Sequence, residues 1–268
     1  MTNRASATTE SFDVREYART AQGSHRGEID VETLARTGLP CDAVRLIRVL
    51  RDLERGTLDR MRNLLVTATH KDARVTAFLA TWAFEKYWIA DALDAVLDAV
   101  GADTSPLTGP PRRTAAERAE RRGPIRRALA GNIAGADIVA GHMTTGLVDE
   151  LITQAAYRRL GDAAAVLSSL VSTLVAVKDR HIAFLAEEAE HKLAASARAV
   201  RLARKEIARA AWPIGAASIP AADRSFFEAY VFGQPGGRAA AARIGEGLAA
   251  LPGMGAASGA TVVARLVP

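Results

Sequence analysis

The sequence predicts an all-α fold, a bundle of four long helices with one long crossover connection, followed by short C-terminal helices. Three observations support this prediction. Hydrophobic residues make up 49% of the 268 residues and aromatic residues only 5%, with alanine and leucine abundant, a composition that favours helices. Apolar residues recur at intervals of three and four along long segments, as on the buried face of a helix. No internal repeat or strand-rich region is visible.

The ends of the long helices are marked by capping and breaking residues. Asp42 is a plausible N-cap of the first helix, and a break at residues 69–72 separates that helix from the second. Gly101 stops the second helix, the Pro-rich stretch TSPLTGPPRR starts the crossover, and Pro213 stops the fourth helix. The expected helices cover about residues 42–68, 73–100, 137–160 and 162–212.

This pattern divides the chain into three parts. Residues 1–40 are polar, with Gly, Thr and Ser scattered through them, and are expected to form a flexible N-terminal arm. Residues 41–213 form the bundle. Residues 214–268 hold short helical segments and a Gly/Ala-rich tail, which we expect to close one end of the bundle or to mediate self-association. The outer helix faces of such a bundle also make a homodimer the expected assembly.

The excess of positive charge is concentrated in the crossover. The net charge is +5, and the stretch RRTAAERAERRGPIRR, from Arg112 to Arg127, holds seven arginines and two glutamates. Such a stretch suits the docking of an acidic partner, for example a carrier protein, although a solvated loop has the same composition. Nucleic acid is not an expected partner, because no aromatic residues interleave with these charges.

Several features predict a cytoplasmic protein. No apolar run approaches the roughly 18 residues that a membrane span needs, so no membrane span is expected. The first thirty residues lack the apolar region of a secretory signal. The single cysteine, Cys41, excludes an internal disulfide and suits a reducing compartment.

Charged residues interrupt the apolar stripe of each long helix. Glu54 lies between Leu50 and Leu58, so its side chain should point inward. The second helix allows two registers, one of which directs Lys86 into the core and the other Glu85. With the third and fourth helices included, the inward-facing polar residues are Glu54, Lys86, Glu150, Lys178 and His181. Glu54 and Lys86 are 32 residues apart, and Glu150 and Lys178 are 28 apart. Each interval is long enough for the chain to run up one helix, turn, and run down the next helix to the same level. We therefore expect these residues to form one buried polar cluster.

Four segments resemble the helices of ferritin-like di-iron carboxylate proteins, in particular an actinobacterial branch related to desaturases. They are LRDLERGTLDRMRNLL, FLATWAFEKYWIADAL, VDELITQAAYRRL and VKDRHIAFL. The C-terminal YVFGQPGGRAAAARIGEGLAALPGM is similar to the same branch, so the resemblance covers roughly residues 40–254. It implies a ferritin-like bundle. In that family two single glutamates and two Glu-x-x-His motifs hold a pair of metal ions.

The ligand set that this resemblance implies is incomplete. Three of the six positions keep a ligand: Glu54, Glu150 and His181. The other three are occupied by Lys86, Ile89 and Lys178. Two ammonium groups would repel a dication and neutralise the two carboxylates, so we expect a site with no metal and no other cofactor. Glu188-x-x-His191 leaves open a displaced site for one metal ion together with His181, or else a solvated acidic patch.

Three functions are compatible with these residues. The first is a metal-independent acid–base enzyme, a cyclase, isomerase or lyase of specialised metabolism that acts on an apolar acyl or polyketide-type substrate. Its catalytic residues would be Lys86, Lys178, Glu54, Glu150 and His181, and its substrate-binding residues Trp82, Trp88, Ile89, Tyr157 and Phe184. The second is a non-catalytic binding or partner subunit, and the third is a di-iron oxidase or desaturase with atypical ligands.

Overall fold

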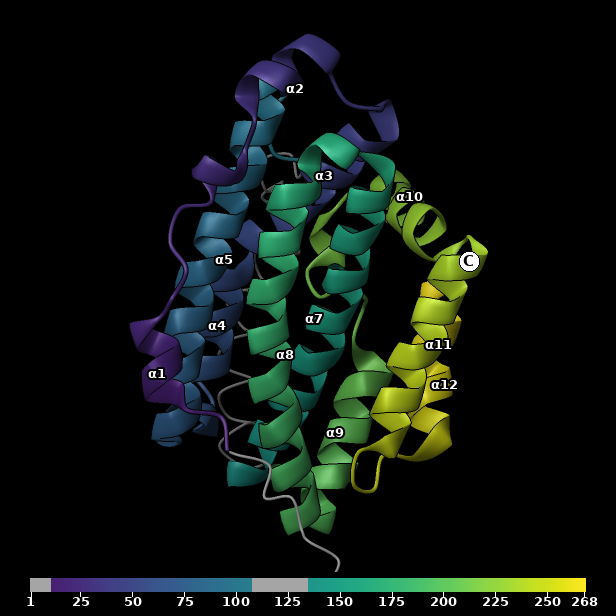
Figure 1. The fold of residues 1–268 in the computed structure, drawn as a ribbon. Coiled ribbons are helices and arrows are strands. Elements are labelled where there is room, and N and C mark those ends of the chain that lie inside the picture. The colour runs from purple at the N-terminus through teal and green to yellow at the C-terminus, as the bar shows by residue number, and fades with distance from the viewer. Residues whose placement is uncertain (1–10, 108–134) are drawn as a thin grey trace, which may run out of the picture.

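The computed structural model describes residues 11–107 and 135–268 (Figure 1). Regular structure in these two ranges is entirely helical, which confirms the all-α class. None of the helices in these ranges is both long and apolar enough to cross a membrane. The arginine stretch from Arg112 to Arg127, for which an acidic carrier protein was considered, lies outside the described residues.

The bundle is built from α3 (Cys41–Arg55), α4 (Thr57–Leu65), α5 (Ala73–Ala99), α7 (Ile138–Ala163) and α8 (Ser168–Ala195). Helices α3 and α4 together occupy the place of the first expected helix and are separated only at Gly56. Helix α3 packs against α5, and α7 packs along α8 (Figure 1). One hydrophobic cluster joins α3, α5, α7 and α8 to the C-terminal part, and a second packs Tyr17 and α4 against α5, α7 and α8.

The fourth expected helix is divided in two. The sequence predicted one helix over residues 162–212, whereas α8 ends at Ala195 and α9 covers Ala197–Arg209. Ser196 between them has an extended backbone, and its side chain accepts hydrogen bonds from the N–H groups of Arg198 and Ala199. This N-cap satisfies donors that a helix start leaves unpaired, so a new helix begins in a different direction.

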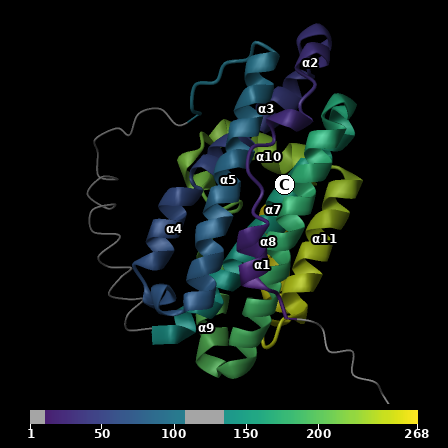
Figure 2. The ribbon, with the colours of Figure 1, turned by 60° about the vertical axis from the view of Figure 1, so that its left-hand side comes forward.

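The N-terminal segment differs from the expected loose arm. Residues 11–30, here called the N-terminal strap, contain α1 (Val14–Arg19) and cross the α5–α8 side of the bundle ahead of α2 (Val31–Thr37) (Figure 2). Tyr17 is only 3% exposed. Phe12 and Tyr17 pack against the rings of Phe78 on α5, with centroids 6.5 Å and 5.4 Å away. These aromatic contacts hold a segment whose composition is otherwise polar.

The C-terminal helices α10 (Ala221–Phe232), α11 (Pro235–Ala250) and α12 (Gly255–Leu266) lie along α7 and α9 (Figure 1). Helices α11 and α12 approach each other closely where Gly245 faces Gly259. A Cβ atom built on Gly259 would overlap the carbonyl group of Gly245, which belongs to a helix backbone and moves only with that helix. The close packing of this pair therefore depends on the missing side chains.

We predict that Gly259→Ala lowers the free energy of unfolding by about 1–3 kcal/mol, because α12 must move away from α11. The matched control is Gly247→Ala on α11, where no atom lies within 4 Å of the new Cβ. That control should instead stabilise the protein by about 0.5–1 kcal/mol, since alanine costs less backbone entropy in a helix. Urea unfolding of both variants measures the difference, and equal stabilities would contradict the packing described.

Candidate functional site

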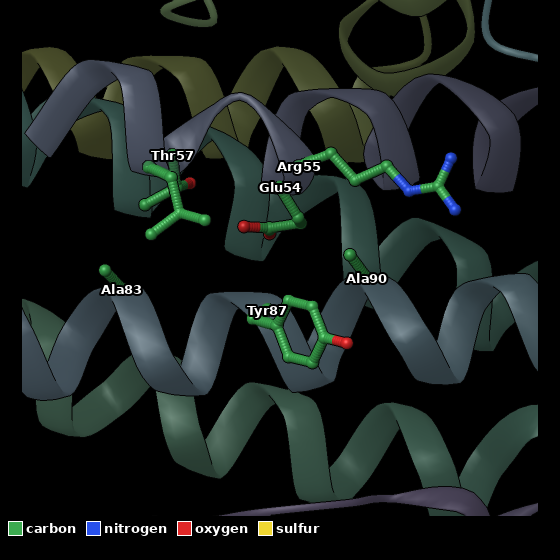
Figure 3. Close-up of a pocket in the computed structure, with 7 residues that line it drawn as sticks. Glu54, Arg55, Thr57, Ala83, Tyr87 and Ala90 are labelled. Atoms are coloured by element: carbon green, nitrogen blue, oxygen red, sulfur yellow. The ribbon is translucent and has the colours of Figure 1, made fainter.

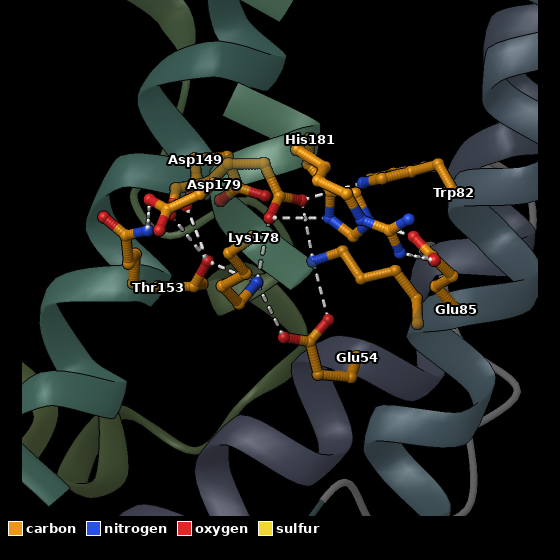
Figure 4. Close-up of polar contacts among 12 residues, drawn as sticks. Glu54, Trp82, Glu85, Asp149, Thr153, Lys178, Asp179 and His181 are labelled. Atoms are coloured by element: carbon orange, nitrogen blue, oxygen red, sulfur yellow. Dashed lines mark hydrogen bonds and ion pairs between the residues drawn. The ribbon is translucent and has the colours of Figure 1, made fainter. Parts of the chain in front are cut away.

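Four charged side chains meet at the centre of the bundle, one from each of α3, α5, α7 and α8 (Figure 4). We call Glu54, Lys86, Glu150 and Lys178 the charge ring. Lys86 Nζ lies 2.6 Å from Glu54 Oε2 and 2.8 Å from Glu150 Oε1. Lys178 Nζ lies 3.0 Å from Glu54 Oε1 and 2.9 Å from Glu150 Oε2. Each lysine therefore bridges both glutamates, so the ring is closed.

The charge ring is buried and electrically balanced. No member is more than 3% exposed. Burial disfavours ionisation of Glu54 and Glu150, but the ammonium groups of Lys178 and Lys86 outweigh it and hold the pKa of each carboxyl below its ordinary value. Burial also disfavours the charge of Lys86, yet Glu150 and Glu54 raise its pKa. All these shifts favour the ionised forms of the three groups. Their pKa values therefore lie further from neutral pH than the ordinary values do.

Neutral donors and one acceptor complete the ring. The indole Nε1 of Trp82 donates to Glu150 Oε1 at 2.8 Å, and the hydroxyl of Tyr157 donates to Glu54 Oε1 at 3.1 Å. Lys178 Nζ donates to Thr153 Oγ1 at 3.0 Å. Two residues expected to bind substrate, Trp82 and Tyr157, thus direct their polar atoms to the ring.

The other expected substrate-binding residues lie apart from one another. Ile89 is fully buried in the core, and Phe184 stacks on Phe78 with ring centroids 3.9 Å apart. Trp88 is half-buried beside the rings of Phe84 and Tyr87. Its indole nitrogen is buried and has no hydrogen-bond partner among the described residues. None of these three side chains is among the residues that line the cleft described below.

Both Glu85 and Lys86 are buried, so the two registers considered for the second helix are not exclusive. Lys86 joins the charge ring, whereas Glu85 points toward α8 and the N-terminal strap. His181 connects the two carboxylate sites, since its Nε2 lies 2.8 Å from Glu85 Oε2 and its Nδ1 lies 3.4 Å from Glu150 Oε2 (Figure 4). All five residues expected to form one polar cluster are therefore brought together.

The N-terminal strap supplies further partners for Glu85. The hydroxyl of Tyr17 and the backbone N–H of Gln22 donate to its two oxygens, each at 2.7 Å, and Arg180 forms an ion pair with it. Burial opposes ionisation of Glu85, but hydrogen bonds from His181 and these donors hold its pKa below the ordinary value. The pKa of Tyr17 is raised by burial and by the charge of Glu85. Sequence reasoning missed Tyr17, and its only signal was an aromatic pair within a polar segment.

The Glu188-x-x-His191 motif does not complete a metal site. Glu188 is buried and forms an ion pair with Arg74, with Lys192 Nζ at 3.7 Å from it. His191 is exposed. Within residues 11–107 and 135–268, no group of three or more His, Cys, Asp or Glu side chains is arranged to hold a metal ion.

The charge ring also does not fit a pair of metal ions. A dinuclear centre needs carboxylates and imidazoles that converge on dications. Here the oxygens of Glu54 and Glu150 converge on two ammonium groups at 2.6–3.0 Å, and the resemblance would assign both lysines to carboxylate positions. A further ligand position of the resemblance is occupied by Ile89, which offers no donor atom. The positive charge that metals would bring is supplied by the chain.

A cleft reaches the charge ring from one side. Its volume is about 220 Å³, and it opens between the α3–α4 junction and α5 (Figure 3). Its lining residues are Glu54, Arg55, Thr57, Leu58, Ala83, Tyr87 and Ala90. A cavity beside His181 large enough for a ligand would favour the enzyme, but this cleft reaches Glu54 instead, and the side chain of His181 is fully buried.

Comparison with known proteins adds no relative to this description. No family model matches the chain, and neither a curated protein nor a solved structure gives a significant match. The fold and the site define an all-α bundle around a buried ring of two carboxylates and two ammonium groups. The resemblance to ferritin-like proteins stays an interpretation of the sequence.

Removing one lysine should strongly destabilise the protein. We predict that Lys178→Met lowers the free energy of unfolding by about 3–5 kcal/mol, because it leaves Glu54 and Glu150 with half of their counter-charge in the core. The control is Arg62→Met, which breaks an exposed pair with Asp59 and should have little effect. Chemical denaturation compares the two, and a Lys178→Met variant as stable as the control would contradict a buried ring.

The charge ring also predicts a stability optimum that is flat around neutral pH. A carboxyl whose folded pKa is lowered contributes stability above its ordinary pKa of 4.5, and this is lost as the pH falls through the folded pKa. Lys86, whose pKa is raised, contributes below its ordinary value of 10.5 and loses this as the pH rises beyond it. We expect thermal unfolding temperatures to fall below pH 4.5 and above pH 10.5. Burial also lowers the pKa of His142 and of His25 from the ordinary 6.5, so these two side chains add a loss of stability below pH 6.5. A steep change between about pH 7 and pH 9, where neither the histidines nor the ring should titrate, would argue against the ring.

Proposed function

We propose that this protein is a metal-free, non-catalytic bundle of ferritin-like descent that acts as a binding or partner subunit. The observation that carries the proposal is the closed charge ring, in which each lysine lies within 3.0 Å of both glutamates. This ring takes the place of a dinuclear metal centre and holds α3, α5, α7 and α8 together. A ring whose charges are already paired has no need of an ion.

The pKa shifts argue against acid–base catalysis by the charge ring. A general acid or base works best with a pKa close to the working pH. In the charge ring the pKa values of the two carboxyls are lowered and the pKa of Lys86 is raised. These groups are therefore less able to exchange protons near neutral pH. His181 has both ring nitrogens next to carboxylates and a side chain with no exposed surface. These groups are arranged for ion pairing.

The second candidate is the acid–base enzyme acting on an apolar acyl or polyketide-type substrate, and the observation that favours it is the cleft that reaches Glu54. It requires that Lys178→Ala or Glu150→Ala abolish turnover while chelators change nothing. A di-iron oxidase with atypical ligands would instead lose its activity with a chelator and regain it with iron.

The proposed function also includes a cytoplasmic location, a homodimer and a place in specialised metabolism. These three parts rest on the sequence alone.

We predict that purified protein contains no stoichiometric iron or manganese, and that adding Fe²⁺, Mn²⁺ or Zn²⁺ leaves its unfolding temperature unchanged. Two ammonium groups in the charge ring oppose a dication and occupy the carboxylate oxygens. Elemental analysis and thermal unfolding with and without a chelator measure this. Two equivalents of bound metal would overturn the proposal.

Restoring the ligand set provides the complementary test. The triple variant Lys86→Glu, Ile89→His and Lys178→Glu should be unstable alone, because it places four carboxylates together, and should be stabilised by divalent metal. A charge-matched control carries Arg62→Glu and Lys205→Glu at exposed positions and should not respond to metal. A triple variant that gains no thermal stability from any of these metals would remove the support for ferritin-like descent.

A further inference from the structure

We propose that the outer face of α5 binds a second copy of this chain, with the two α5 helices packed against each other in antiparallel orientation. The proposal rests on the homodimer of the proposed function, for which it names the surface. Three observations support it: an exposed apolar stripe on α5, opposite charges at the two ends of that stripe, and a cleft beside its middle.

An apolar stripe runs along the solvent-facing side of α5. Phe84 and Tyr87 are 47% and 56% exposed, and exposed alanines continue the stripe toward the start of the helix at Ala73, Ala77 and Ala80. The spacings between these five residues alternate between four and three, the pattern by which two helices pack along each other. In the described part of the chain the stripe stays open to solvent, with α4 on one side of it and α1 on the other (Figure 2). A contiguous exposed apolar surface of this kind marks a protein interface.

The charges at the two ends of the stripe identify a second copy as the partner. Lys71 is exposed just before α5 begins, and Asp98 is exposed next to its last residue. A second α5 in antiparallel orientation brings Lys71 of each subunit close to the partner subunit's Asp98. A parallel copy would instead place like charges together, which costs free energy. The face is therefore complementary to itself in one orientation.

The aromatic residues and the charges agree on one register. A two-fold axis that crosses α5 midway between Phe84 and Tyr87 sets Phe84 of each copy against the partner subunit's Tyr87. The midpoint between Lys71 and Asp98 differs from this position by only one residue, so the same axis serves both pairs. The same surface patch then serves both subunits, as a two-fold interface requires. The alanines of the stripe allow the two helices to approach closely.

The cleft beside the axis is covered in this arrangement. Ala83 and Ala90 line it on either side of the axis, and Leu58 and Tyr87 form part of its lining with 47% and 56% of their surface exposed. A two-fold axis perpendicular to α5 keeps α4 on the same side in both copies, so the two clefts face each other. The exposed apolar surface of Leu58 and Tyr87 is then removed from water, which stabilises the dimer.

The charged residues of the cleft do not oppose this covering. Arg55 already forms an ion pair with Asp94, and Glu54 already pairs with Lys86 and Lys178. Burying a charge is costly when it has no partner, and neither of these two lacks one. The second copy thus shields the charge ring from solvent on the side of the cleft.

The size of the face is of the order that a dimer needs. Helix α5 has 27 residues and is therefore about 40 Å long, and a helix with its side chains is about 10 Å wide. A face that also includes α4 measures several hundred square ångströms. A standard interface buries about 800 Å² per partner, so this face is of the right order for a stable dimer.

The first test changes the apolar centre of the face in the full-length protein. The double variant Phe84→Glu, Tyr87→Glu should raise the dissociation constant of the dimer by roughly 100-fold or more, because it buries four unpaired carboxylates at the axis. The matched control is Val31→Glu on α2, which changes an apolar side chain of similar exposure, 52%, outside the face and should leave the constant unchanged. Sedimentation equilibrium measures the constants, and circular dichroism shows that the variants are folded.

The second test reverses the charges at the ends of the stripe. Lys71→Glu alone should weaken the dimer by roughly fivefold, because it sets a carboxylate near the partner subunit's Asp98 at both ends. Adding Asp98→Lys to the same chain should restore the affinity to within about twofold, since each pair then has opposite charges again. Both positions are exposed, so these variants should fold as the wild type does.

Each other outcome overturns a defined part of the proposal. A wild type that stays monomeric at 100-fold the usual micromolar concentrations would remove both the interface and the homodimer. A dimer that persists in the folded Phe84→Glu, Tyr87→Glu variant would remove this surface but leave the homodimer of the proposed function. If that variant does not fold, the charge reversal decides, and a Lys71→Glu, Asp98→Lys variant no tighter than Lys71→Glu would overturn the antiparallel arrangement. Metal analysis tests the metal-free bundle separately.

Discussion

Charge balance in the buried centre of the bundle is the constraint on which the rest of this structure depends. Two ammonium groups and two carboxylates share the centre of the bundle, and each is within 3.0 Å of two opposite charges. Because ions leave water at a high cost, the ring is tolerable only when all four members are present. The four helices that carry it are therefore held at one level and in one rotational setting. A register shift of any one helix would leave charges unpaired in the core.

The layers around the ring follow from the same requirement. The remaining polar atoms of the ring need partners, so Trp82 and Tyr157 donate to its carboxylates and Thr153 accepts from Lys178. His181 extends the network to a fifth charged group, Glu85, which lies on the opposite side of α5 from the cleft. That carboxylate in turn determines how the N-terminal segment lies, since both of its oxygens take donors from it. The polar core thus organises an outer segment that has little apolar sequence of its own.

Helical periodicity and rise per residue were sufficient to predict that Glu54, Lys86, Glu150, Lys178 and His181 meet. Such a prediction works because long helices in a bundle have few degrees of freedom. It failed for features that tertiary contacts decide. Adjacent residues on α5 were treated as alternatives, but that helix is covered on two sides and buries both. The contacts of Tyr17 and the division at Ser196 depend on a few specific contacts in polar segments, where periodicity carries no information. The cleft depends on the absence of side-chain volume, which no pattern of polarity records.

The N-terminal strap has a consequence for the order in which the chain is assembled. Residues 11–30 are synthesised before the groups that receive them: Glu85 on α5, then Arg180 and Glu187 on α8. Phe12 and Tyr17 therefore spend most of translation without the aromatic pocket that finally covers them. Complete docking of the strap therefore requires that α5 and α8 have already come together.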